Sequence, residues 1–247
     1  MISSVLRIEK TEREDNPQDL EVLIKGEYRM KILYILAVGF MVISVCFTQQ
    51  SAMGTDAQTD CKTGCRYYES QNYTEALKWF RKSADQGDAM AQGLLGMMYF
   101  EGKGVTQDYP EALKWTRKSA DQGNAVSQVR LGRSYLSGQG VPQNYAEALT
   151  WFHKSADQRY ANAQLNLGFL YYKGEGVTQN YTEALKWFRK SADQGNATAQ
   201  AQLGVMYYFG KGVAKNLIEA KNWFRKAAAQ GDEEALKMMQ ELTKMGF

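Results

Sequence analysis

Histidine, cysteine and proline are scarce in this chain, with one, three and three residues among 247. A single histidine, His153, without a cysteine cluster gives no zinc-binding spacing, and three cysteines are too few for a scaffold built from disulfides. The formal net charge of +3 is too small to indicate nucleic-acid binding. The sequence also has no strand followed by a glycine-rich phosphate loop, no nucleophile-elbow serine and no assembled catalytic triad. We therefore predict a protein that is not an enzyme, with no catalytic residue, metal site or cofactor.

Folded, helical structure is indicated by what the chain does contain. Hydrophobic residues make up 44% of the sequence and charged residues 23%, which is a globular composition. The 22 glycines far outnumber the prolines. This balance favours helices whose turns are made by glycine.

One long hydrophobic run, Ile32–Phe47, follows Lys31 and precedes small and polar residues. This order is typical of a secretory signal peptide, here placed at residues 30–54. The alternative is a membrane anchor, although sixteen apolar residues are fewer than the ~20 that cross a bilayer. We expect a periplasmic or secreted protein with no stable membrane insertion after cleavage.

Residues 1–29 do not suit the start of a signal peptide, because they carry five basic and seven acidic side chains. Our hypothesis is that Met30 is the true start and that residues 1–29 come from a mis-called start. The alternative is a disordered extension that is translated.

A fixed period of 36 residues organises the rest of the sequence. It separates all five tryptophans: Trp79, Trp115, Trp151, Trp187 and Trp223. Around them recurs the motif Glu-Ala-Leu-x-Trp-Phe-x-Lys-Ser-Ala-Asp-Gln, and the same period returns a Gly-x-Gly-Val turn. The units lie at about 57–88, 89–124, 125–160, 161–196 and 197–232, followed by a capping helix over 232–247.

Each unit is predicted to contain two helices, here called helix A and helix B. Residues 161–172 place apolar side chains on one stripe of a helix A, and residues 181–194 do so in a helix B, with Trp187 in the buried seam. Asn144 and Asn180 are placed to cap helix B. Glycine recurs in the middle of helix A at Gly132 and Gly168, which indicates close approach of helix B. One pair cannot bury both faces, so neighbouring units must stack.

These motifs resemble the Sel1-like repeat, a relative of the tetratricopeptide repeat. The pattern Leu-Gly-x-x-Tyr, Gly-x-Gly-Val, then Asn/Asp-Tyr-x-Glu-Ala-x-x-Trp-Phe-x-Lys-Ser-Ala-x-Gln-Gly is nearly complete over 131–158. The resemblance covers about residues 57–247. It implies an all-α fold, a right-handed α/α superhelical solenoid, with helix A on the concave side and a role as a scaffold or adaptor for a protein or peptide.

The face of helix A opposite the recurring residues changes from unit to unit, so we predict that it binds the partner. The residues singled out on helices A are Met90, Leu94, Met97, Met98, Arg130, Arg133, Asn166, Phe169, Gln202, Val205 and Phe209. Clustered large apolar groups beside arginine are typical of interface anchors. We expect a monomer that binds no nucleic acid.

Two further hypotheses concern function and redox state. Some cysteine-rich Sel1-like proteins are described as β-lactam binders or β-lactamases, but here the four full repeats contain no cysteine pair. A secreted effector that engages a host protein is a third reading. Cys61 and Cys65 share a helix face, so a local disulfide, an intermolecular bridge or two free thiols are the alternatives.

Overall fold

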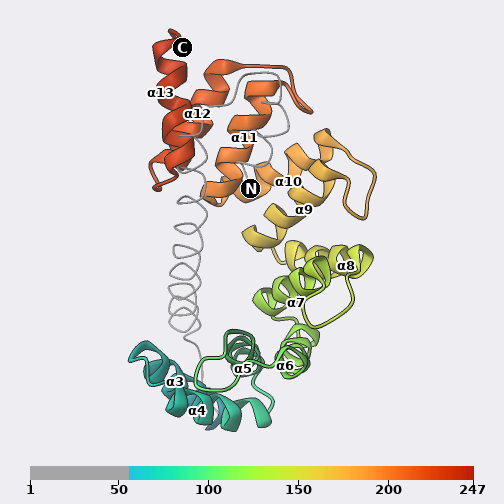
Figure 1. Cartoon of the computed structure of the whole chain (residues 1–247), viewed down its shortest axis with the longest axis vertical. Helices are drawn as coiled ribbons and strands as arrows, with labels where there is room; N and C mark the ends of the chain where they lie inside the picture. The colour runs from blue at the N-terminus through green and yellow to red at the C-terminus, as the bar shows by residue number, and fades with distance from the viewer. Residues whose placement is uncertain (1–55) are drawn as a thin grey trace, which may run out of the picture.

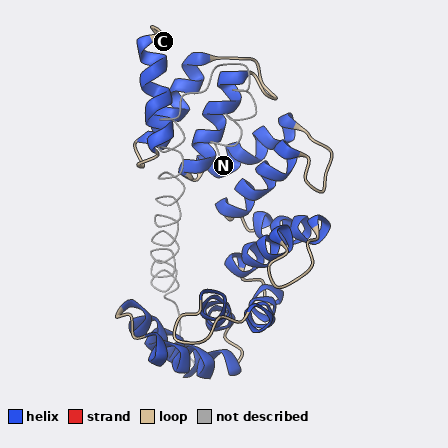
Figure 2. Cartoon of the chain, in the orientation of Figure 1, coloured by secondary structure: helices blue, strands red, loops and turns tan. Residues whose placement is uncertain are grey.

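The structure is a computed structural model that describes residues 56–247, and within this range it contains helices and no strand (Figure 2). In Figure 1 these helices follow one another along an arc, with α5 and α7 on its inner side and α6 and α8 on its outer side. The helices of type A are α3 Asp56–Glu69, α5 Ala89–Glu101, α7 Ala125–Ser137, α9 Ala161–Lys173, α11 Ala197–Phe209 and α13 Glu233–Lys244. Those of type B are α4 Tyr73–Asp85, α6 Tyr109–Asp121, α8 Tyr145–Asp157, α10 Tyr181–Asp193 and α12 Leu217–Ala228. The predicted all-α solenoid of helix pairs is therefore confirmed.

Asparagine and aspartate begin the helices, and glycine ends helix A. The side chain of Asn180 accepts a hydrogen bond from the amide of Glu183 at 3.0 Å, and Asn144 caps α8 in the same way. Such a bond satisfies one of the free amides in the first turn of a helix. At the other end, Gly174 caps α9 with a φ of 76°, a left-handed conformation that costs glycine no steric strain. Both predicted cap positions are confirmed.

The mid-helix glycines of helix A make room for a phenylalanine of helix B. A Cβ atom added to Gly168 would lie 2.5 Å from the Phe188 ring, and one added to Gly132 would lie 2.7 Å from Phe152. Phe80, Phe152 and Phe188 are completely buried. The predicted close approach is thus confirmed, and the fully buried ring belongs to phenylalanine.

Trp187, which precedes Phe188, is less buried than we predicted. Trp187 is half-buried, and the ammonium of Lys190 lies 4.0 Å from the centre of its ring. Trp115 is better covered, and its Nε1 donates to Glu111 at 2.8 Å. Glu111 is itself half-buried. Trp115, Trp151 and Trp223 are buried, as the helix pattern predicts, and Trp187 is less buried than they are.

Buried glutamines of helix A form hydrogen bonds both within and between units. Within a unit, Gln158 donates through Nε2 to Oε1 of Gln128 at 2.9 Å, and Gln194 donates to Gln164 at 2.7 Å. The same bond joins Gln122 to Gln92 and Gln230 to Gln200. Between units, Nε2 of Gln128 donates to the carbonyl of Ala120 at 3.1 Å. The helix A glutamines are buried, so leaving one of them unpaired would cost about 1–3 kcal/mol.

A second contact between neighbouring units, a hydrogen bond from arginine to tyrosine, is missing at one place. Arg189 donates to the hydroxyl of Tyr207 at 2.7 Å, and Arg117 makes the equivalent bond to Tyr135. His153 stands where the arginine would be, and its ring packs edge-on against Trp187 with centroids 5.6 Å apart. The His153 side chain is half-buried.

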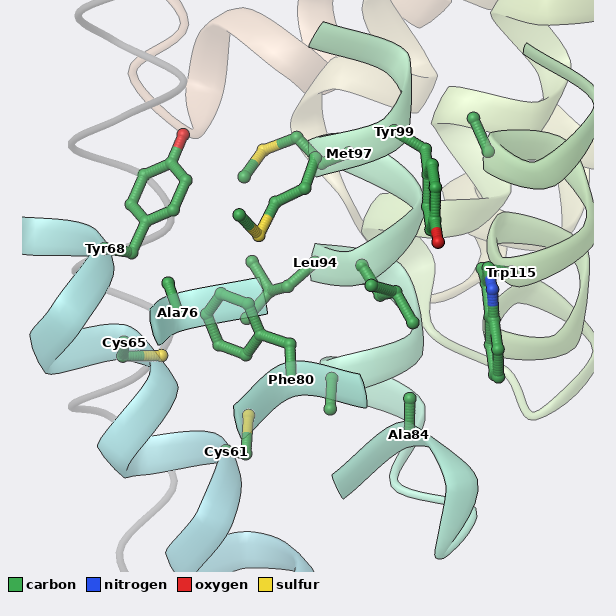
Figure 3. Close-up of a cluster of buried hydrophobic side chains, with 14 residues drawn as sticks. Cys61, Cys65, Tyr68, Ala76, Phe80, Ala84, Leu94, Met97, Tyr99 and Trp115 are labelled. Carbon is green, nitrogen blue, oxygen red and sulfur yellow. The ribbon is translucent and has the colours of Figure 1, made fainter. Parts of the chain in front are cut away.

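The two ends of the described residues differ from the middle. At the first unit, α3 packs on α4 and α5 through the cluster drawn in Figure 3, which includes Cys61, Cys65 and Phe80. At the other end, α13 buries Ala235 and Leu242 and half-buries Met239, as its amphipathic pattern predicts. No helix of the described residues is long and apolar enough to cross a membrane. The predicted mis-called start and the signal peptide fall outside residues 56–247.

Candidate partner-binding surface

The inner face of the arc is formed by the side of helix A that turns away from its own helix B. In α7, for example, Gly132 faces Phe152 of α8, so residues 126, 130, 133 and 137 turn the other way. The side chain of Arg130 also crosses to the preceding helix A, where its Nη1 donates to the carbonyl of Gly93 at 2.9 Å. Neighbouring helices A are therefore in direct contact along this face.

That contact removes more than half of the predicted anchors from the surface. The residues Leu94, Met97, Met98, Phe169, Gln202 and Val205 are each less than 9% exposed. Leu94 and Met97 belong to the cluster around Phe80, where Figure 3 shows them close to Ala76. The prediction that these six side chains project into a groove is wrong, because stacked units bury this part of the face.

The remaining predicted residues stay accessible. Arg133 is exposed, and Met90, Arg130, Asn166 and Phe209 are half-buried. Arg130, Arg133 and Asn166 lie on α7 and α9, in the middle of the arc (Figure 1). The accessible part of the predicted surface is thus mostly polar and central.

Sequence reasoning missed two residues beside this polar centre. Tyr160 precedes α9, and its hydroxyl accepts a hydrogen bond from Nδ2 of Asn162 at 3.4 Å. Oδ1 of Asn162 in turn accepts from Nδ2 of Asn196 at 3.0 Å. Nδ2 of Asn166 donates to the backbone carbonyl of Asn162 at 2.6 Å. The central patch is defined here as Arg130, Arg133, Tyr160, Asn162 and Asn166.

Burial changes the acidity of two groups in the central patch. It lowers the pKa of Arg130, and the negative charge of Glu101 opposes this effect. It also raises the pKa of Tyr160, against the hydrogen bond from Asn162 and the positive charge of Arg130. An arginine remains protonated under these conditions, so the patch carries a partly desolvated positive charge.

The chain departs from its own repeat next to the central patch. Other units have glycine and then aspartate or asparagine between helix B and helix A, whereas here Arg159 and Tyr160 stand in these places. Arg159 has a φ of 62°, and Tyr160 makes no side-chain cap bond to α9. A left-handed non-glycine residue costs roughly 1–2 kcal/mol and a lost cap about 1 kcal/mol. Both penalties occur in the same junction, which is the one that supplies Tyr160 to the patch.

Of the three alternatives for Cys61 and Cys65, the local disulfide is not formed, because Cys61 is a free, buried thiol. The i, i+4 spacing satisfies the distance criterion, but both side chains are committed to the core cluster of Figure 3. Burial raises the pKa of the Cys61 thiol well above its usual range.

No other grouping of the described residues indicates chemistry at this surface. None of them forms a group of three or more histidine, cysteine, aspartate or glutamate side chains that could hold a metal ion. What the inner face offers is hydrogen-bond donors, a positive charge and aromatic edges. Groups of these kinds are common in protein–protein interfaces.

Taken with the fold, this surface defines a tandem helix-pair repeat protein with a constant framework and a variable inner face. The Sel1 repeat family model matches residues 63–88, 89–124, 125–160, 161–196 and 197–232. The chain therefore belongs to the Sel1 repeat family, which confirms the resemblance seen in the sequence. Among curated proteins, no significant match is found.

Two solved structures are similar to the chain at 34% sequence identity and a TM-score of 0.72. One is a protective antigen present in uropathogenic Escherichia coli strains that displays an SLR fold; the match covers 77% of this chain and 42% of the antigen. The other is a Sel1 repeat protein from Oxalobacter formigenes, with 75% of this chain and 76% of that protein covered. The chain thus spans about two fifths of the antigen and three quarters of the Oxalobacter protein.

Proposed function

We propose that the protein is an exported scaffold that binds a protein or peptide on the inner face of its solenoid. The observation that supports this proposal is the contrast in sequence between helix B and the inner face of helix A. Helix B repeats almost the same sequence in every unit, whereas one half-buried inner position of helix A is successively Met90, Val126, Asn162 and Thr198. A framework needs constancy, and a surface that reads different parts of one partner needs variation.

Export is supported by the apolar run at 32–47, which follows Lys31 and precedes small and polar residues as in a secretory signal peptide.

The mass of the protein recovered from the periplasm or the medium tests this part of the proposal. Measured without reduction, it distinguishes a cleaved chain from one that retains residues 30–54. Recovery of the protein from the cytoplasm alone would refute export.

Binding is tested with the photo-crosslinking residue p-benzoylphenylalanine in native cells. Ser137, exposed at the inner end of α7, is replaced in one variant, and Lys186, exposed on the outer helix α10, in the control. We expect a crosslinked partner, identified by mass spectrometry, from position 137 and not from position 186. Equal capture from both positions, or capture from the outer helix alone, would contradict the assignment to the inner face.

A further inference from the structure

The charge of the inner face is unbalanced at the central patch. The variable positions of helices A carry one carboxylate, Glu101, which pairs with Lys103 at 2.8 Å. Lys173 on the same face is 3.3 Å from Glu175. Arg130 has no ion pair with a carboxylate among residues 56–247. The positive charge that is left over lies with Arg130.

The guanidinium of Arg130 is held in place by a hydrogen bond that uses only part of its donors. One of its five N–H donors bonds the Gly93 carbonyl, which fixes the guanidinium between α5 and α7. The group is half-buried, so it has lost part of its hydration. A carboxylate that approached it would form short, charge-assisted hydrogen bonds, which are stronger than neutral ones.

The amide network beside Arg130 adds a fixed polar wall. The bonds from Asn196 to Asn162 and from Asn166 to the Asn162 carbonyl hold these side chains in one arrangement. Tyr160 extends the wall, and the chain gives up a helix cap to place a tyrosine there. Local rules of sequence design are broken most often where a function requires it.

We propose that the central patch binds an acidic side chain of an extended partner segment, with Arg130 contacting the carboxylate and Tyr160 and Asn166 positioning the segment. This inference rests on the proposed function, because it uses the same inner face. It commits to an acidic peptide: one or two arginines beside amides suit a single carboxylate, whereas a nucleic-acid backbone requires a longer row of cations.

The probe is a phage-displayed library of random twelve-residue peptides, selected on the immobilised full-length protein. Three variants are selected in parallel: Arg130→Lys keeps the charge, Arg130→Met removes it and Arg130→Glu reverses it. Circular dichroism and thermal melting establish that each variant is folded. Lys186→Met on the outer helix is the matched control, because it also removes one exposed cation.

We expect the wild type and Lys186→Met to enrich peptides that share an aspartate or glutamate. The same peptides should bind Arg130→Met at least tenfold more weakly, and Arg130→Glu should no longer select acidic residues. Arg130→Lys should retain acidic selection with lower affinity, since lysine lacks the forked geometry. If Arg130→Met is unfolded, Arg130→Lys and Arg130→Glu still give the comparison.

Three other outcomes would overturn the inference in distinguishable ways. Enrichment of peptides without acidic residues, or equal enrichment by wild type and Arg130→Met, would overturn the acidic partner and leave the inner-face scaffold standing. Selection of phosphate-bearing ligands such as single-stranded DNA in preference to peptides would overturn the choice of a peptide. No enrichment on any variant, together with no crosslink from position 137, would overturn the proposed function as well.

Discussion

Single residues explain why the repeat tolerates glycine in the middle of helix A. Alanine is the better helix former by about 1 kcal/mol, so the glycine must gain more than that elsewhere. At Gly168 the gain is space, because an added methyl group would lie 2.5 Å from the rigid ring of Phe188. The ring is fully buried and cannot move outward without opening the core.

Replacing Gly168 by alanine should therefore destabilise the protein in spite of helix propensity. We expect a loss of about 1–3 kcal/mol in the free energy of unfolding, the usual cost of overpacking a core. Urea denaturation followed by circular dichroism measures it. Phe188→Leu in the same chain should recover part of the loss, and an alanine variant as stable as the wild type would show that helix B can shift.

Gln202 has a buried side-chain amide that makes no hydrogen bond. It is completely buried, and neither its Nε2 nor its Oε1 has a hydrogen-bond partner. The second unit has Leu94 at the same position. Gln202→Leu should therefore raise the free energy of unfolding by about 1–2 kcal/mol, because it removes an unsatisfied amide. Asn166→Leu is the control: its amide is bonded and half-buried, and we expect no gain there.

At the scale of elements, helix limits follow from local sequence rules and are the most predictable part of the fold. Asparagine or aspartate before the first turn and glycine after the last are each sufficient to place a helix end. Two junctions depart from these rules, because a non-glycine residue takes a left-handed conformation there: Gln71 between α3 and α4, and Arg159 between α8 and α9. Glycine would adopt this conformation without strain.

Arg159→Gly should stabilise the protein by about 1 kcal/mol, since the side chain is exposed and the backbone strain is the main change. The reverse substitution, Gly195→Arg, is a matched control. Gly195 has a φ of 87°, and no atom lies within 4 Å of where its Cβ would be. We expect it to lose a similar amount, measured by urea denaturation; a shift of the same sign in both variants would contradict the argument.

The attachment of α3 to α4 should depend on pH. The Asp60 carboxylate accepts hydrogen bonds from Lys82 at 3.0 Å and from Gln86 at 2.8 Å. The Lys82 contact is the main reason that the pKa of Asp60 lies below its ordinary value of 3.8, and burial opposes it. A carboxyl whose pKa is lower in the folded state than in the unfolded state stabilises the protein at pH values above the unfolded-state pKa. This stabilisation is lost as the pH falls through the folded-state pKa.

We therefore expect the thermal unfolding midpoint to decrease as the pH falls below about 4. Protonation of Asp60 should account for part of this decrease. Asp60→Asn should be less stable than the wild type at neutral pH and less sensitive to acid. Thermal melts from pH 7 to pH 3 measure both. Identical acid sensitivity in the variant would show that other carboxylates dominate.

At the scale of the whole molecule, the sequence was sufficient for the repeat architecture and insufficient for the surface. The 36-residue period gives the stacking of units directly. The candidate site depends on contacts between helices A that lie far apart in sequence. No helical pattern distinguishes Phe169, which is buried against the Phe188 ring, from Arg133, which is exposed. Tyr160 was missed because it lies in a junction, although its departure from the repeat was visible.

The same junction determines how the solenoid should open. In repeat proteins each unit contacts only its neighbours, so stability is a sum of unit and interface terms and the weakest interface opens first. Between α8 and α9 the chain lacks the arginine-to-tyrosine bond, because His153 replaces arginine, and it also lacks a helix cap and a glycine. The Gln158–Gln128 and Gln194–Gln164 amide bonds lie within the units on either side and do not cross this interface. The three losses fall at one interface, in the centre of the arc.

Native-state hydrogen exchange should therefore resolve two cooperative units, residues 56–157 and residues 161–247, with different free energies of opening. Restoring the junction with His153→Arg and Arg159→Gly together should bring the two values closer. The variant leaves the central patch intact, so any change in peptide binding would report on the flexibility of the arc. If all amides of the wild type exchange with one free energy, the junction is not the weak interface.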